Sequence, residues 1–200
     1  MKQWRVGCIA VATLCTLSAC ATARAAPRES ARHLAAAVVL SPALDAPPLA
    51  LPNYDGTPVT PARLRGAVLL VTFTYTHCRT VCPLIVARLR ALRQELGSTA
   101  RNVQLIAVSS DPQGDTPEAV GQFLAAHDMT GRMLYLVGSR AALGATWRMW
   151  HVDVAAQGQR LVDHTAAVFA VSAAGKLAAI YGPDFQPPDI AHDIPLLMRT

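Results

Sequence analysis

Charged residues are scarce in this chain of 200 residues, at 16%, and aromatic residues make up only 6%. Lysine and arginine nowhere form a run interleaved with aromatic side chains, which argues against nucleic acid as a partner. The formal net charge of +5 is small and indicates little beyond solubility. No internal repeat is visible, and a hydrophobic content of 52% suffices for the core of one domain.

Cysteine is also scarce within the predicted domain. Of five cysteines, Cys8 and Cys15 lie near the N-terminus, and only Cys78 and Cys82 fall inside the predicted domain. The C-x-x-C-H pattern of haem attachment is absent, and so is the Pro-x-x-x-Thr-x-x-Cys pattern of peroxiredoxins. The five methionines are scattered, so a methionine-rich copper-binding cluster is not predicted. The cysteines in the domain therefore need another explanation.

The N-terminus has the pattern of a secretory signal peptide. A short positive start precedes an apolar stretch at residues 6–17, which is too short to span a bilayer. It ends in Leu-Ser-Ala-Cys20, which resembles the lipobox of bacterial lipoproteins, where the peptidase cuts before a cysteine that carries diacylglycerol. We expect residues 1–19 to be the signal peptide and Cys20 to be lipidated.

Two other outcomes at the N-terminus remain open. Residues 23–25, Ala-Arg-Ala, fit an ordinary signal-peptidase site, which would release a soluble protein. Alternatively, residues 6–23 could stay uncleaved as a membrane anchor. All three outcomes place the domain outside the cytoplasm, and the first makes it a membrane-anchored lipoprotein on the periplasmic side. Thiols in an oxidising compartment seldom persist without a use, which directs attention to Cys78 and Cys82.

The remainder of the chain divides into a tether and a domain. Residues 20–50 are rich in alanine, proline and arginine, which is typical of a flexible tether, and we place the domain at residues 51–200. Strands alternate with helices there and a hairpin closes the pattern, so an α/β fold with a mixed sheet is expected. Strands are expected at 67–75, 103–108, 133–137, 166–172 and 176–181, and helices at 83–96, 115–127, 139–150 and 189–198.

The two cysteines lie between the first strand and the first helix of this pattern. Unpaired N–H groups and the helix dipole favour anions at a helix N-terminus, and they lower thiol pKa values there. The C-x-x-x-C spacing puts both sulfurs on one helical face, close enough to form a disulfide or to hold a soft ion. Cu(I) accepts two or three ligands and favours thiolates, whereas zinc usually takes four.

A third ligand is less certain from the residues alone. His164 precedes a predicted strand and is placed in a loop that could face the cysteines. His151, which follows a predicted helix, is a serious rival. Spacing does not decide between them.

Three segments resemble the signature segments of the Sco/SenC family, in the family's order and at similar spacing. They are residues 73–83, 108–118 and 162–165 (Val-Asp-His-Thr), and the resemblance extends over residues 51–181. It implies a thioredoxin-like, three-layer fold with a mixed central sheet and an inserted hairpin. It also implies one copper ion, Cu(I) or Cu(II), bound by Cys78, Cys82 and His164, with Cys78 and Cys82 also able to form a redox disulfide. One departure is Arg79-Thr80, where the family usually has Pro-Asp or a similar pair.

The resemblance further implies a metallochaperone that delivers copper to the Cu-A centre of cytochrome c oxidase. The partner would be the copper-accepting subunit of that oxidase or another copper chaperone. An alternative is a thiol–disulfide reductase acting on the acceptor's cysteines, which would make the protein an enzyme. Asp111 matches an aspartate near the family's site, and Asp163 is expected to be either a loop residue or a residue beside the ligands. A role for Asp111 as a turn residue before Pro112 is equally consistent with the sequence.

Overall fold

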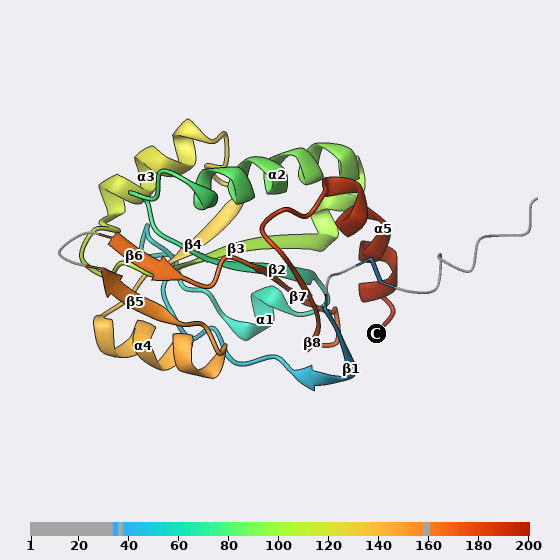
Figure 1. The fold of residues 1–200 in the computed structure, drawn as a ribbon. Helices are drawn as coiled ribbons and strands as arrows, with labels where there is room; N and C mark the ends of the chain where they lie inside the picture. Colours follow the sequence, from blue (N-terminus) through green and yellow to red (C-terminus); the bar gives the residue numbers. More distant parts are fainter. Residues whose placement is uncertain (1–33, 36–37, 158–160) are drawn as a thin grey trace, which may run out of the picture.

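A six-stranded mixed sheet forms the middle layer of the computed structural model, which describes residues 34–35, 38–157 and 161–200 (Figure 1). Side chains of residues 155–164 lie outside the described part of the structure. The strand order is β1-β8-β7-β2-β3-β4. The strands are β1 (Val38–Asp45), β2 (Val68–Thr74), β3 (Val103–Ser109), β4 (Met133–Leu136), β7 (Val168–Val171) and β8 (Lys176–Tyr181).

Strand β2 lies in the interior of the sheet because both of its faces are apolar. It pairs in parallel with β3 and antiparallel with β7, and six of its seven residues are buried. Such runs of branched and apolar residues are typical of strands covered by helices on both sides. The chain leaves β2 at the carboxyl end of the parallel strands, where α/β sheets commonly bind ligands.

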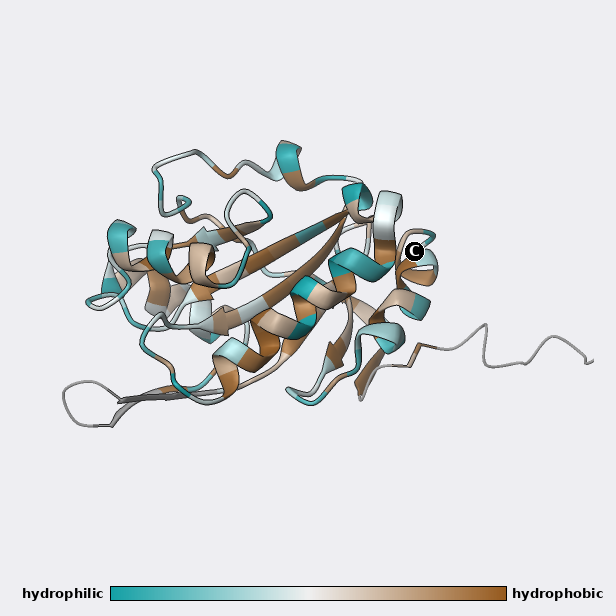
Figure 2. Cartoon of the chain, turned by 90° about the horizontal axis from the view of Figure 1, so that it is seen from above, coloured by the Kyte–Doolittle hydropathy of each residue, from teal (hydrophilic) through white to brown (hydrophobic). Residues whose placement is uncertain are grey.

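Helices cover both faces of the sheet, as Figure 1 shows. One core joins the sheet to α2 (Val81–Leu96), α3 (Pro117–Ala126) and α5 (Pro187–Leu197). A second core, on the other face, contains α4 (Arg140–Met149) with Trp147, and α1 (Pro61–Leu64) packs beside it. The short 3-10 helix η2 (Gly97–Asn102) follows α2. Figure 2 shows that the central strands are largely hydrophobic. The predicted three-layer, thioredoxin-like fold is confirmed.

Local signals set the helix boundaries close to the predicted ones. Helix α3 begins with proline at its first position after Thr116, whose hydroxyl accepts the Ala119 N–H. Helix α4 begins after Ser139, which caps it in the same way through Ala142. Helix α2 ends at Gly97, with φ of 52°, a conformation that glycine adopts without strain.

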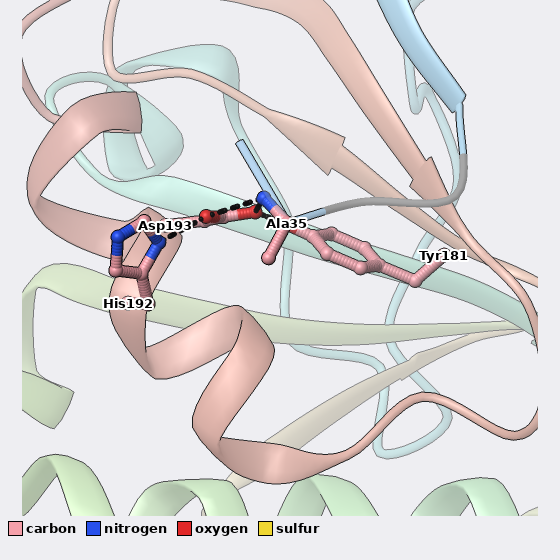
Figure 3. A network of polar contacts seen from close by, with 4 residues as sticks. All are labelled: Ala35, Tyr181, His192 and Asp193. Carbon is pink, nitrogen blue, oxygen red and sulfur yellow. Dashed lines mark hydrogen bonds and ion pairs between the residues drawn. The ribbon is translucent and has the colours of Figure 1, made fainter. Parts of the chain in front are cut away.

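The predicted tether of residues 20–50 differs from the structure in its last part. Residues 38–45 form β1, which pairs antiparallel with β8 at the edge of the sheet. Just before β1, the Ala35 N–H donates to both carboxylate oxygens of Asp193, at 2.9 and 2.8 Å (Figure 3). Asp193 is fully buried and also accepts the Tyr181 hydroxyl and contacts His192 Nδ1. The folded unit therefore begins before residue 51.

A separate two-stranded sheet is inserted between α4 and β7. Strands β5 (Val154–Gln157) and β6 (Leu161–His164) pair antiparallel and form the hairpin that the family resemblance implied. His164, expected in a loop, ends β6 and pairs with Val154. In both Figure 1 and Figure 2 this hairpin lies at the end of the molecule where α2 begins. In the described parts of the chain, no helix is both long and apolar enough to cross a membrane.

Candidate metal centre

Cys78 and Cys82 lie where β2 has ended and α2 begins. The Cys78 N–H donates to the Tyr75 carbonyl at 3.2 Å, which closes a turn directly after the strand. Cys82 is the second residue of α2, and its N–H donates to Cys78 Sγ at 3.4 Å. Both residues are present as thiols, not as a disulfide, and are 6% and 1% exposed. The helix N-terminus thus directs a backbone donor at the first sulfur, as the sequence predicted.

The two thiols differ in their readiness to ionise. Burial opposes ionisation of Cys78, but hydrogen bonds from the Cys82 thiol and from the Thr80 and Cys82 backbone outweigh it and lower the pKa of Cys78. Burial, followed by the hydrogen bond to Cys78, raises the pKa of Cys82 to about 12. Cys78 is therefore the first thiolate of the pair. A metal held by both sulfurs must release the Cys82 proton on binding.

The surroundings of the pair are apolar on the protein side and polar toward solvent. Tyr75 and Val81 pack against the two cysteines in a small cluster of their own. The intervening Arg79 and Thr80 are exposed, and the Thr80 hydroxyl lies 3.8 Å from Cys78 Sγ. A soft cation would thus meet sulfur donors in a largely water-excluded setting, open on one side.

Asp111 acts as a turn residue in the loop that follows β3. Its Oδ1 accepts the N–H groups of Gln113 and Gly114, at 3.1 and 3.0 Å. This is the turn chemistry that the sequence left open. A further role for Asp111 beside the metal ligands stays a prediction.

Asp115, in the same loop, is a residue whose importance the sequence did not indicate. Its carboxylate is buried and accepts the Thr76 N–H at 2.8 Å, two residues before Cys78. It also accepts the hydroxyls of Ser109 and Tyr135, at 2.6 and 2.9 Å. Burial raises the pKa of Asp115 although these hydrogen bonds oppose the shift. Its position before a helix cap hid this role, because the contacts join segments that are far apart in sequence.

His164 and Asp163 are placed by their backbone, since their side chains lie outside the described part of the structure. The base of the hairpin is fixed where the Thr165 N–H donates to the Asp153 carbonyl at 3.3 Å. The rival, His151, is exposed at the end of α4 with φ of 53°. Among the side chains that the structure describes, no three His, Cys, Asp or Glu residues cluster as metal ligands. Ligation by His164 therefore stays a prediction.

The fold and the paired thiols at α2 define a thioredoxin-like protein with a C-x-x-x-C motif. A model of the SCO1/SenC family matches residues 41–199, and the chain belongs to this family. An SCO1 protein homolog of Bacillus subtilis is 32% identical over 83 residues, which are 42% of this chain and 43% of that protein.

Two solved structures add detail about relatives. The structure of Bradyrhizobium japonicum ScoI with copper bound is 26% identical, with a TM-score of 0.65, and the match covers 74% of this chain and 95% of that one. A structure of BsSco, described as a member of the Sco family of cytochrome c oxidase assembly proteins with a disulfide switch, is 25% identical. Its TM-score is 0.68, with 78% and 95% of the chains covered. The chain spans about half the length of the first curated relatives it matches, 43% and 52%.

Proposed function

We propose that this chain binds one copper ion through Cys78, Cys82 and His164 and passes it to an acceptor protein. The observation that carries the proposal is the thiol pair at the start of α2, with Cys78 Sγ held 3.4 Å from the Cys82 N–H. Two neighbouring sulfurs in an apolar setting suit Cu(I), which prefers thiolates. His164, at the end of β6, supplies the third ligand in this proposal.

The donor set fits copper better than zinc. Two sulfurs and one imidazole nitrogen satisfy Cu(I), whereas structural zinc sites are nearly always closed by four ligands. Three ligands also leave a position for an incoming thiolate, so the ion can leave by ligand exchange. The copper-bound structure of the Bradyrhizobium japonicum relative supports the choice of metal.

The acceptor in this proposal is the Cu-A site of cytochrome c oxidase, reached directly or through another copper chaperone. The description of BsSco as belonging to cytochrome c oxidase assembly proteins supports it. We further propose that the protein works on the periplasmic side, anchored through lipidated Cys20. The lipobox-like sequence before Cys20 is the support for this location.

Thiol–disulfide exchange with the acceptor is a second candidate function, favoured by the difference between the two thiols. Cys78, with the lowered pKa, attacks a partner disulfide and forms a mixed disulfide, releasing one partner thiolate. Cys82 then gives up its proton and displaces the second partner thiolate. Two electrons pass to the partner, which becomes a dithiol, and Cys78 and Cys82 become a disulfide. The disulfide switch in BsSco supports this alternative.

Copper affinity of the full chain tests the copper-binding proposal, and oxidase assembly in cells separates it from thiol–disulfide exchange. Cu(I) competition titrations against a chromophoric chelator are expected to show one tight site, weakened by Cys78→Ser, Cys82→Ser and His164→Ala. His151→Ala is the matched control and should bind copper like the wild type. Unchanged copper affinity in all three ligand variants would refute copper binding at this site. If His164→Ala loses copper but still supports oxidase assembly in cells, thiol–disulfide exchange becomes the better account.

A further inference from the structure

We propose that Asp115 is the positioning residue of the cysteine pair, holding the turn from Tyr75 to Cys78 in the geometry that copper binding needs. This inference rests on the proposed copper function. Asp115 acts on the pair through the backbone: its Oδ1 accepts the Thr76 N–H at 2.8 Å, two residues before Cys78. That amide is one of the first backbone donors after β2 has ended, so no strand partner fixes it. The Asp115 carboxylate supplies the acceptor that a neighbouring strand would otherwise provide for this N–H.

The carboxylate is itself held by the neighbouring strands. Oδ2 accepts the hydroxyl of Ser109, the last residue of β3, and the hydroxyl of Tyr135 in β4. The Tyr135 oxygen is also 3.3 Å from the carbonyl of Thr74, the last residue of β2. Asp115 therefore joins the ends of three parallel strands to the first turn of the cysteine loop. A single carboxylate with donors from three sides has little freedom to move.

The loop at residues 111–115 also packs closely against the residues that precede Cys78. A methyl group on Gly114 would collide with Asp111 Oδ2 and lie 3.2 Å from His77 Nδ1. Asp111 cannot easily turn away, because its other oxygen accepts the N–H groups of Gln113 and Gly114. The loop from Asp111 to Asp115 thus lies against both Thr76 and His77, immediately before the first cysteine.

The consequence for copper is preorganisation. If the turn is fixed before the metal arrives, no ordering cost is subtracted from the binding free energy. Residues that orient metal ligands without binding the metal themselves typically contribute about 10- to 100-fold to metal affinity. Without an acceptor for the Thr76 N–H, the turn loosens and the contact from the Cys82 N–H to Cys78 Sγ is no longer maintained.

The test compares Asp115→Ala with Asp115→Asn and with Asp193→Ala in the full chain. Asp193 is a second buried aspartate with several donors, and it lies on α5 rather than in the loops around the cysteines, so it is the matched control. Cu(I) competition measures affinity, and hydrogen-exchange mass spectrometry of the metal-free chain follows the peptide covering residues 75–82. Asp115→Ala should bind Cu(I) about tenfold or more weakly and exchange faster in that peptide. Asp115→Asn keeps an acceptor oxygen and should stay within about threefold of the wild type.

Several results would overturn the assignment. Wild-type copper affinity and wild-type exchange in Asp115→Ala would do so, and so would an equal loss of affinity in Asp193→Ala. If Asp115→Ala does not fold, Tyr135→Phe and Ser109→Ala take its place, since each removes one donor to Oδ2. Wild-type copper affinity and exchange in both would then refute the proposal. The exchange measurement uses metal-free protein, so it stays decisive if the wild type itself binds no copper, which would refute only the copper function.

Discussion

Two buried aspartates, Asp115 and Asp193, use the same chemistry in different parts of the molecule. Each accepts one backbone N–H and one tyrosine hydroxyl, and each contacts one more side chain. At Asp115 the N–H belongs to Thr76 and leads into the cysteine loop. At Asp193 the N–H belongs to Ala35 and leads into edge strand β1. The same kind of anchor therefore fixes the candidate metal centre in one place and the segment before edge strand β1 in the other.

Burial and hydrogen bonding alone therefore do not identify a functional carboxylate. What distinguishes Asp115 is the segment that its N–H partner belongs to. Stability and function should consequently separate when the two aspartates are altered in parallel.

The largest effect is expected from removing each carboxylate. Asp115→Ala and Asp193→Ala leave buried donors without acceptors, at about 1–3 kcal/mol for each. Both variants should therefore lose roughly 3–5 kcal/mol of unfolding free energy. Urea denaturation monitored by circular dichroism measures this loss. A change below about 1 kcal/mol at either position would show that the corresponding network contributes little.

A smaller effect is expected from the two tyrosines. Tyr135→Phe and Tyr181→Phe each remove one buried hydroxyl that donates to an aspartate, and each should cost about 1 kcal/mol. Only Tyr135→Phe should also weaken Cu(I) binding, because only its aspartate partner holds the cysteine loop. Denaturation and copper competition on the same samples measure both. Equal copper losses in the two variants would erase the distinction between the regions.

The glycines next to the two networks provide a steric comparison. In Gly114→Ala the new methyl group meets Asp111, which is held by two N–H groups, so we expect a loss of about 1–3 kcal/mol. In Gly182→Ala, directly after β8, the methyl group meets the carboxylate of exposed Asp184 at 2.8 Å. That side chain can rotate into solvent, so the loss should stay below about 1 kcal/mol. Thermal denaturation ranks the two variants, and the reverse order would contradict this description of the loop.

The smallest effect concerns pH. Burial raises the pKa of Asp115, so its contribution to stability is present below the ordinary aspartate pKa and is lost as pH rises through the raised value. The unfolding free energy of the wild type minus that of Asp115→Asn should therefore decrease with rising pH in the acid range. Hydrogen bonds from Thr57 lower the pKa of Asp55, so the difference for Asp55→Asn should increase instead. Urea titrations from about pH 3 to 7 measure both slopes, and equal signs would contradict the assignment.

Much of the fold was predictable because its signals are local. The apolar run at β2, the caps before α3 and α4, and the glycine after α2 set the element boundaries within a few residues. The placement of Cys78 and Cys82 at a helix start followed from the same signals. The C-x-x-x-C motif lies between the end of a central strand and the start of a helix, and both boundaries are visible in the sequence.

The missed features depend on contacts between distant parts of the chain. Strand β1 lies in a proline-containing segment and has mostly exposed side chains, so no apolar pattern marks it. It becomes a strand by pairing with β8, more than a hundred residues further along. The role of Asp115 likewise depends on Thr76 and Tyr135, which no local pattern connects to it.

X-ray absorption at the copper edge of the copper-loaded full chain tests the central claim most directly. Wild-type protein should show two sulfur scatterers and one imidazole nitrogen. His164→Ala should keep both sulfurs and lose the imidazole signal, and His151→Ala should match the wild type. An imidazole signal that persists in His164→Ala, or a copper shell without two sulfurs in the wild type, would contradict the proposed site.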